Sequence, residues 1–206
     1  MSGPRVKVCG ICRTEDAQLA VRLGASAIGF IFWPASPRYC DPARAKEIAA
    51  ILPGHITVVG VFVDQPVSHV VEIADSVPLG AVQLHGGETV ADFDRVRQPL
   101  IKAVAVTPSF VHDLVDRLPP GVTVLLDAHD PVRRGGTGRT IDWTTAASVA
   151  ARRRTILSGG LHAGNVREAI VQVNPHMIDV SSGVESAPGV KDAGKLRAFF
   201  AAVAAA

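Results

Sequence analysis

Cys9 is the residue whose type and position point most directly to chemistry. It closes the short apolar run 6–9, and Lys7 lies two positions earlier, on the same face if the run is a β-strand. If that face lines a barrel interior, the ammonium group lies one layer below the thiol and favours the reactive thiolate. The alternative is a small buried side chain, the common role of a lone cysteine. The position at a strand end favours the reactive role.

Cys9 and Cys12 also form a Cys-x-x-Cys motif between a predicted strand and a predicted helix. This spacing is typical of thiol redox proteins, but a thioredoxin-like domain would cover only about half of the chain. The sequence has no second Cys-x-x-Cys and no close histidine pair to complete a zinc site. We therefore rank redox and metal-binding functions below the chemistry of a free thiol and expect no metal.

Two aspartates close later apolar runs. Asp127 ends the run 122–127, where a carboxylate is costly to bury unless it faces a polar pocket, so we place it at a pocket mouth. A partly desolvated carboxyl group can act as a general acid, whereas the structural alternative is a cap on the next loop. Asp179 either binds a sugar hydroxyl or holds the turn 181–183 in place, and the sequence does not separate these roles.

Arg38, Asp64 and His85 are further polar candidates near predicted strand ends. Arg38 lies in the proline-stiffened loop 36–39, where its guanidinium could bind a carboxylate through two parallel hydrogen bonds. The alternative is a solvated surface arginine. His85 follows the run 81–84 and either lines a substrate pocket or is simply hydrogen-bonded.

Two glycine-bearing turns late in the chain predict a phosphate site. Gly159 and Gly160 follow one short apolar run, and Ser181, Ser182 and Gly183 follow the next. Glycine lets the backbone approach an anion, and amides at the start of a helix direct donors toward it. Barrel enzymes commonly bind phosphate with the loops after strands 7 and 8. The expected substrate is therefore a phosphate ester.

Eight β-rich runs alternate with helix-periodic segments, which predicts that residues 1–206 form one domain, a single (β/α)8 TIM barrel. An open doubly wound sheet has the same local alternation, and the count of eight favours the barrel. The glycine- and arginine-rich segment 129–140 is predicted to be a mobile lid. The predicted strands are 6–9, 27–32, 57–63, 81–84, 101–106, 123–127, 155–157 and 177–180, and the helices begin near Thr14, Asp41, Val67, Thr89, Ser109, Trp143, Asn165 and Asp192.

The composition excludes several function classes. The 206 residues are 48% hydrophobic and 19% charged, which argues against disorder, and a formal net charge of +2 gives no basis for binding nucleic acid. No apolar run approaches the roughly 20 residues needed to cross a membrane, and the first residues lack the apolar core of a secretory signal. We expect a cytoplasmic enzyme that acts on a small phosphorylated molecule, as a monomer or a homodimer.

The order of these motifs resembles the phosphoribosylanthranilate isomerase family, single-barrel enzymes of tryptophan biosynthesis that perform an Amadori rearrangement. The resemblance runs nearly from end to end of the chain. It rests on KVCGI (7–11), GFIF (29–32), SPRY (36–39), VGVFV (59–63), VQLHG (82–86), LLD (125–127), GGTG (135–138), DW (142–143), LSGGL (157–161), DVSSGVE (179–185) and PGVKD (188–192).

The resemblance implies that Cys9 is the general base and Asp127 the general acid, with no cofactor. Arg38 would bind the anthranilate carboxylate, the two glycine turns the phosphate, and Asp179 the sugar or aniline part of N-(5-phosphoribosyl)anthranilate. The similar isomerase of histidine biosynthesis has aspartate in place of Cys9, so Cys9 together with Arg38 favours anthranilate. A thiol redox protein and a catalytically silent phosphate-binding protein are two further hypotheses. Cys12 departs from the family, which more often has threonine, and oxidation to a Cys9–Cys12 disulfide would remove the thiolate.

Overall fold

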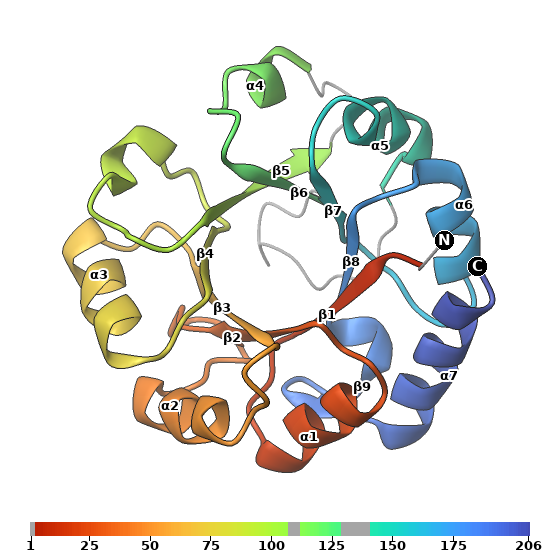
Figure 1. Cartoon of the computed structure of the whole chain (residues 1–206), viewed down its shortest axis with the longest axis horizontal. Coiled ribbons are helices and arrows are strands. Elements are labelled where there is room, and N and C mark those ends of the chain that lie inside the picture. Colours follow the sequence, from red (N-terminus) through yellow and green to blue (C-terminus); the bar gives the residue numbers. More distant parts are fainter. Residues whose placement is uncertain (1–2, 107–111, 129–140) are drawn as a thin grey trace.

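The computed structural model describes residues 3–106, 112–128 and 141–206, and its core is a closed barrel of eight parallel strands. The strands follow one another around the barrel in chain order, and β8 closes it by pairing with β1. Figure 1 shows the barrel in end view, with the strands inside and the helices outside. The predicted barrel is confirmed. Its strands are β1 (Arg5–Cys9), β2 (Ala27–Ile31), β3 (Thr57–Phe62), β4 (Ala81–Leu84), β5 (Leu100–Val106), β6 (Thr123–Ala128), β7 (Thr155–Leu157) and β8 (Met177–Val180).

Three of the helices that cover the barrel begin where the sequence supplies a capping side chain. Asp41, Asp142 and Asp192 each occupy an N-cap position and accept hydrogen bonds from backbone amides of the first turn. Within the described residues, no helix is long and apolar enough to cross a membrane. The α-helices are α1 (Thr14–Arg22), α2 (Pro42–Ala50), α3 (Val67–Ser76), α4 (His112–Asp116), α5 (Trp143–Ala150), α6 (Val166–Val173) and α7 (Ala193–Ala204), and the 3₁₀ helices are η1 (Val90–Phe93) and η2 (Ser182–Val184).

The strands are buried on both faces, as parallel strands covered by helices must be. Outward-facing side chains form the large core under the helices, and inward-facing ones form a smaller apolar cluster in the barrel. A few buried polar residues interrupt this inner face, and each lies two positions from a member of the inner cluster on the same strand. Because a buried polar group needs a partner, these residues must form hydrogen bonds or ion pairs inside the barrel. They are Lys7, Gln83, Asp127 and Asp179.

Two regions differ from the predicted element order. The helix expected near Thr89 is only the short turn η1, because Glu88 binds the Gly86 amide and fixes the preceding loop, and Pro99 disfavours helical backbone just before β5. The antiparallel pair β9 (Glu185–Ala187) and β10 (Val190–Lys191) has no counterpart among the predicted elements. The helix start near Ser109 and the lid predicted at 129–140 lie outside the described residues.

Candidate active site

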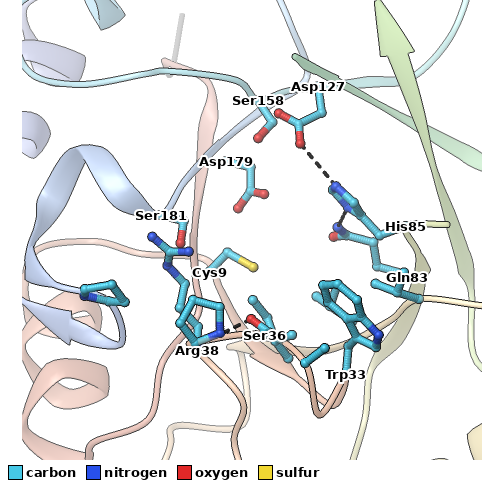
Figure 2. A pocket seen from close by; sticks show the side chains of 16 residues that line it. Cys9, Trp33, Ser36, Arg38, Gln83, His85, Asp127, Ser158, Asp179 and Ser181 are labelled. Carbon is cyan, nitrogen blue, oxygen red and sulfur yellow. Dashed lines mark hydrogen bonds and ion pairs between the residues drawn. The ribbon is translucent and has the colours of Figure 1, made fainter. Parts of the chain in front are cut away.

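A cavity of about 460 Å³ lies at the carboxyl ends of the barrel strands. Side chains from several strands and from the loops that follow them point into it (Figure 2). Gly159, Gly160, Ser182 and Gly183 are not among its lining residues, but their neighbours Ser158 and Ser181 are. The cavity brings together six of the residues selected from the sequence, namely Cys9, Arg38, His85, Asp127, Asp179 and Ser181.

Cys9 ends β1 and places its thiol in the barrel interior, above the fully buried Lys7. Gly29 lies opposite Cys9 on β2, and a Cβ there would be 2.9 Å from Cys9 Sγ and 3.1 Å from Lys7 Cε. The missing side chain at Gly29 therefore makes room for both groups. Burial raises the pKa of the Cys9 thiol, and the Lys7 ammonium offsets only part of that rise. The charge of Lys7 acts in the expected direction, but burial outweighs it.

Lys7 is held between two acceptors inside the barrel. Its Nζ donates to Asp179 Oδ1 and to Gln83 Oε1, each at 3.0 Å. Burial alone lowers the pKa of Lys7, but the attraction of Asp179 and of Cys9 outweighs burial, so the pKa is raised above its ordinary value. Lys7 is therefore an ammonium ion at neutral pH, and Asp179, which lines the cavity, is tied to it.

Asp127 and His85 form a largely buried pair on the other side of the cavity (Figure 2). Asp127 Oδ2 lies 3.1 Å from His85 Nε2, and Asp127 Oδ1 accepts a hydrogen bond of 2.8 Å from the Ala128 amide. The other ring nitrogen, His85 Nδ1, lies 2.8 Å from Gln83 Nε2. A carboxyl group held in this way next to a cavity is suited to transfer a proton to a bound molecule.

Arg38 reaches from the loop after β2 to Glu185 on β9, and the fully buried Lys191 Nζ contacts the same carboxylate at 2.7 Å. Burial raises the pKa of Glu185, but the hydrogen bonds and charges of Arg38 and Lys191 outweigh it, so the pKa is lowered. Burial also lowers the pKa of Lys191, and Glu185 only partly restores it. Lys191 Nζ in addition donates to the Cys9 carbonyl oxygen at 2.6 Å. Two cations share one carboxylate, and of these three residues Arg38 is the one that lines the cavity.

The loops after β7 and β8 lie against each other, as the phosphate prediction requires. Gly159 and Gly160 have φ values of 88° and 63°, a region that favours glycine. A Cβ at Gly183 would collide with the carbonyl oxygen of Leu161, so the contact between the two loops depends on glycine. The buried Ser181 Oγ has no hydrogen-bond partner within the described residues and is available to a bound group.

Some candidates and partners differ from the set chosen from the sequence. Asp64 is not among the cavity-lining residues, and its carboxylate accepts a hydrogen bond of 2.6 Å from the Gly87 amide, a role in loop structure. Gln83, Glu185 and Lys191 were not selected from the sequence. Gln83 has a local signal, because it is a polar residue on the inner face of an apolar strand. The pairing of Glu185 with Arg38 has no local signal, because the two residues lie far apart in the sequence.

The arrangement of polar groups fits organic acid–base chemistry better than metal chemistry. Among the described residues, no group of three or more histidine, cysteine or acidic side chains could hold a metal ion. The reactive candidates are a thiol, a carboxyl group paired with an imidazole, and cationic groups able to bind anions. A closed barrel with these groups in one cavity at its carboxyl end defines the class of (β/α)8-barrel enzymes.

Comparison with known proteins identifies the family. The family model described as N-(5'phosphoribosyl)anthranilate (PRA) isomerase matches residues 6–202, and the chain belongs to this family. The isomerase from Pseudomonas putida strain W619 is 46% identical over 204 residues, which cover 98% of each chain. The crystal structure of the Thermotoga maritima enzyme is 40% identical, with a TM-score of 0.89, and the alignment covers 98% of this chain and 100% of that one.

A second solved isomerase bears on the ligand class. It is 38% identical, with a TM-score of 0.86 and coverage of 98% of this chain and 100% of that one, and it is a complex with reduced 1-(o-carboxyphenylamino)-1-deoxyribulose 5-phosphate. That ligand carries both a carboxylate and a phosphate. The family, the fold and the aldose–ketose isomerase activity expected from the sequence are confirmed.

Proposed function

We propose that this chain converts N-(5-phosphoribosyl)anthranilate into 1-(2-carboxyphenylamino)-1-deoxyribulose 5-phosphate with Asp127 as general acid and Cys9 as general base. The observation that carries this assignment is that both side chains line one cavity although they come from β6 and β1. The two groups have different surroundings, an imidazole and an amide around Asp127 and an ammonium below Cys9. Such a difference allows one group to give a proton and the other to take one.

The first step is the opening of the ribose ring. Asp127 gives its proton to the ring oxygen, the C1–O bond breaks, and the lone pair of the anilino nitrogen forms the C=N bond of a protonated Schiff base. The product of this step at the protein is the Asp127 carboxylate. The contact of Asp127 with His85 Nε2 and with the Ala128 amide supports this role, because both are placed to hold the carboxylate.

The second step is the removal of the C2 proton. The Cys9 thiolate takes this proton, and the electron pair of the C–H bond moves into the C1–C2 bond while the C=N electrons return to nitrogen, which gives an enolamine. A proton shift from the C2 hydroxyl to C1 then gives the ketone. The cationic Schiff base favours the thiolate by charge attraction, which offsets the burial that raises the pKa of the Cys9 thiol.

The two charged ends of the substrate need two anion sites on opposite sides of the reacting carbons. Arg38 at the rim is proposed to bind the anthranilate carboxylate, and the turns that contain Gly159, Gly160, Ser181, Ser182 and Gly183 are proposed to bind the phosphate. Asp179 and His85 border the space between these sites and are proposed to contact the sugar or the aniline ring. Substrate held at both ends presents C2 to Cys9 without further ordering.

The test is turnover of freshly prepared N-(5-phosphoribosyl)anthranilate, followed by loss of its fluorescence and by mass and NMR identification of the product. We expect rapid formation of the deoxyribulose phosphate product. Decay at the spontaneous rate would refute the proposed function. The same assay with N-(5-phosphoribosyl)aniline, which lacks the carboxylate, tests Arg38, and we expect a higher KM for this compound.

The cellular setting is proposed on the same basis. A reducing compartment, the cytoplasm, would keep Cys9, Cys12 and Cys40 as the free thiols observed. The chain is proposed to act as a monomer or a homodimer. Fractionation and sedimentation of the native protein would measure both properties.

A further inference from the structure

A line of hydrogen bonds runs across the barrel from Lys7 to Asp127. Lys7 Nζ lies 3.0 Å from Gln83 Oε1, Gln83 Nε2 lies 2.8 Å from His85 Nδ1, and His85 Nε2 lies 3.1 Å from Asp127 Oδ2. The bonds join strands β1, β4 and β6 and the first residue after β4. Figure 2 shows the last two bonds at the edge of the cavity. Asp127 is thus connected to the Lys7 ammonium through the side chains of Gln83 and His85.

The direction of each bond follows from the first one. An ammonium group only donates, so the atom of Gln83 that faces Lys7 must be its amide oxygen. The amide nitrogen of Gln83 then faces His85, and because this nitrogen also only donates, Nδ1 must be the unprotonated acceptor. This pattern of hydrogen bonds corresponds to the tautomer of His85 that carries its proton on Nε2, from which it donates to Asp127.

We propose that Gln83, oriented by Lys7, is a positioning residue that holds His85 as the neutral Nε2–H tautomer so that Asp127 can act as a general acid. The proposal deepens the proposed function and rests on it for the role of Asp127. An imidazolium ion in the same place would form an ion pair with Asp127 and keep Asp127 ionised. Asp127 would then have no proton to give. The imidazolium ion is disfavoured because its second proton, on Nδ1, would point at the amide hydrogens of Gln83.

The charges around His85 act in opposite directions, since the Asp127 carboxylate attracts a cation and the Lys7 ammonium repels one. Asp127 on β6 is the carboxylate in direct contact, and Lys7 adds a positive charge behind Gln83 that disfavours a second cation. Lys102 on β5, next to β4, is paired with Glu88 at 2.8 Å. Asp64, after β3, accepts the Gly87 amide hydrogen. Once Asp127 has given its proton to the ribose ring oxygen, the Nε2–H of His85 stabilises the carboxylate that forms. The hydrogen bond from His85 to Asp127 therefore strengthens as the reaction proceeds.

The first experiment needs no variant and no substrate. The ¹⁵N and ¹H spectrum of the His85 ring in the wild-type protein distinguishes the two neutral tautomers and the imidazolium ion. We expect a protonated Nε2 and an unprotonated Nδ1 at neutral and mildly acidic pH. An Nδ1–H tautomer or an imidazolium ion would overturn the proposal, whatever the activity. The expected tautomer in a protein that does not turn over the substrate would refute the proposed function instead.

The second experiment uses Gln83→Met, which keeps the bulk but removes the donor, and Gln83→Glu, which replaces the donor by an acceptor. We expect kcat to fall by about 10–100-fold in Gln83→Met near pH 6 with little change in KM, and to recover as pH rises above about 6.5, where an ordinary histidine loses its proton. Gln83→Glu should lose more activity because it favours a proton at Nδ1.

Gln98→Glu is the matched control, since Gln98 donates to Ala74 O away from the cavity. We expect this variant to keep the wild-type pH profile. A Gln83→Met enzyme with the wild-type pH profile and kcat would overturn the proposal. The wild-type spectrum tests the tautomer of His85 even if both Gln83 variants fail to fold.

Discussion

Arg38 donates to both carboxylate oxygens of Glu185, from Nε at 3.0 Å to each and from Nη2 at 2.8 Å to Oε2. The two residues are 147 positions apart, and the contact ties the loop after β2 to the hairpin after β8. An arginine held through two of its nitrogens has little freedom left to lose when it binds an anion. The pair therefore fixes the direction in which Arg38 presents its remaining donors, which we propose bind the substrate carboxylate.

Glu185→Gln is expected to weaken both binding and stability. The amide holds Arg38 less firmly, so KM for N-(5-phosphoribosyl)anthranilate should rise on the order of 10-fold while kcat changes less. Lys191 keeps its buried charge without a counter-ion, so the free energy of unfolding should fall by about 3 kcal/mol. Steady-state kinetics and urea unfolding measure the two effects. Glu47→Gln, which alters an exposed pair with Arg44 on α2, is the control, and equal behaviour of the two variants would contradict this role of Glu185.

Gly183→Ala is expected to impair the proposed phosphate site. The added methyl group would push against the Leu161 carbonyl oxygen and separate the two loops. A loss of about 1.4 kcal/mol in phosphate binding corresponds to a tenfold higher inhibition constant for inorganic phosphate. Competitive inhibition by phosphate measures this. Gly121→Ala is the control, because a Cβ at Gly121 meets nothing within 4 Å. Unchanged inhibition in Gly183→Ala would remove these loops from the phosphate site.

Gly29→Ala is expected to displace the thiol of Cys9. The new Cβ would lie 2.9 Å from Sγ, closer than van der Waals contact allows, so the sulfur or β2 must move. We expect kcat to fall by about 10–100-fold, because a shift of about 1 Å at a reacting group is costly. Gly54→Ala, where a Cβ meets nothing within 4 Å, should behave as the wild type. Wild-type kcat in Gly29→Ala would show that the thiol position is not critical.

The pH dependence of the reaction should report the ionisation of Cys9. Burial raises the pKa of this thiol and the base is the thiolate, so kcat/KM should rise with pH and continue to rise beyond the ordinary cysteine value of 9.0. Lys7 lowers the pKa of Cys9, so Lys7→Met should move the rising limb to still higher pH. Lys46→Met, which removes an exposed lysine of α2, should leave the limb unchanged. A wild-type kcat/KM that reaches its plateau below pH 8 would contradict the assignment of Cys9 as the base.

The sequence predicted the parts of this structure that depend on local pattern. Six of the strands begin at the predicted residue because short apolar runs bounded by polar loops carry a clear signal, and these are the strands that start at Ala27, Thr57, Ala81, Thr123, Thr155 and Met177. The helices capped by Asp41, Asp142 and Asp192 also begin where expected. A helix does begin next to Thr89, as predicted, but it is only the 3₁₀ turn η1, because loop contacts and a proline outweighed helix propensity, which is a tertiary effect.

The candidate site was predictable where a residue type at a strand end was sufficient evidence. Cys9, His85 and Asp127 meet in the cavity because parallel strands bring their carboxyl ends to one rim. The residues that tune these three side chains were harder to predict from the sequence. Lys7 was expected to favour the thiolate, yet the depth of burial, which decides the sign for Cys9, is known only from the fold. Glu185 reaches Arg38 through a hairpin with no local signal. Two statements stay predictions. One is that residues 1–206 form one domain, and the other is that oxidation forms a Cys9–Cys12 disulfide.

The most direct test of the central claim compares kcat of the wild type, Cys9→Ser and Cys12→Ser with saturating N-(5-phosphoribosyl)anthranilate under reducing conditions. A hydroxyl is a far weaker acid than a thiol, so Cys9→Ser cannot supply an anionic base at the same pH. We predict that kcat of Cys9→Ser falls by about 10²–10⁴-fold with phosphate inhibition unchanged, and that Cys12→Ser stays near the wild type. Near-normal turnover by Cys9→Ser would contradict the proposed mechanism and remove Cys9 from it.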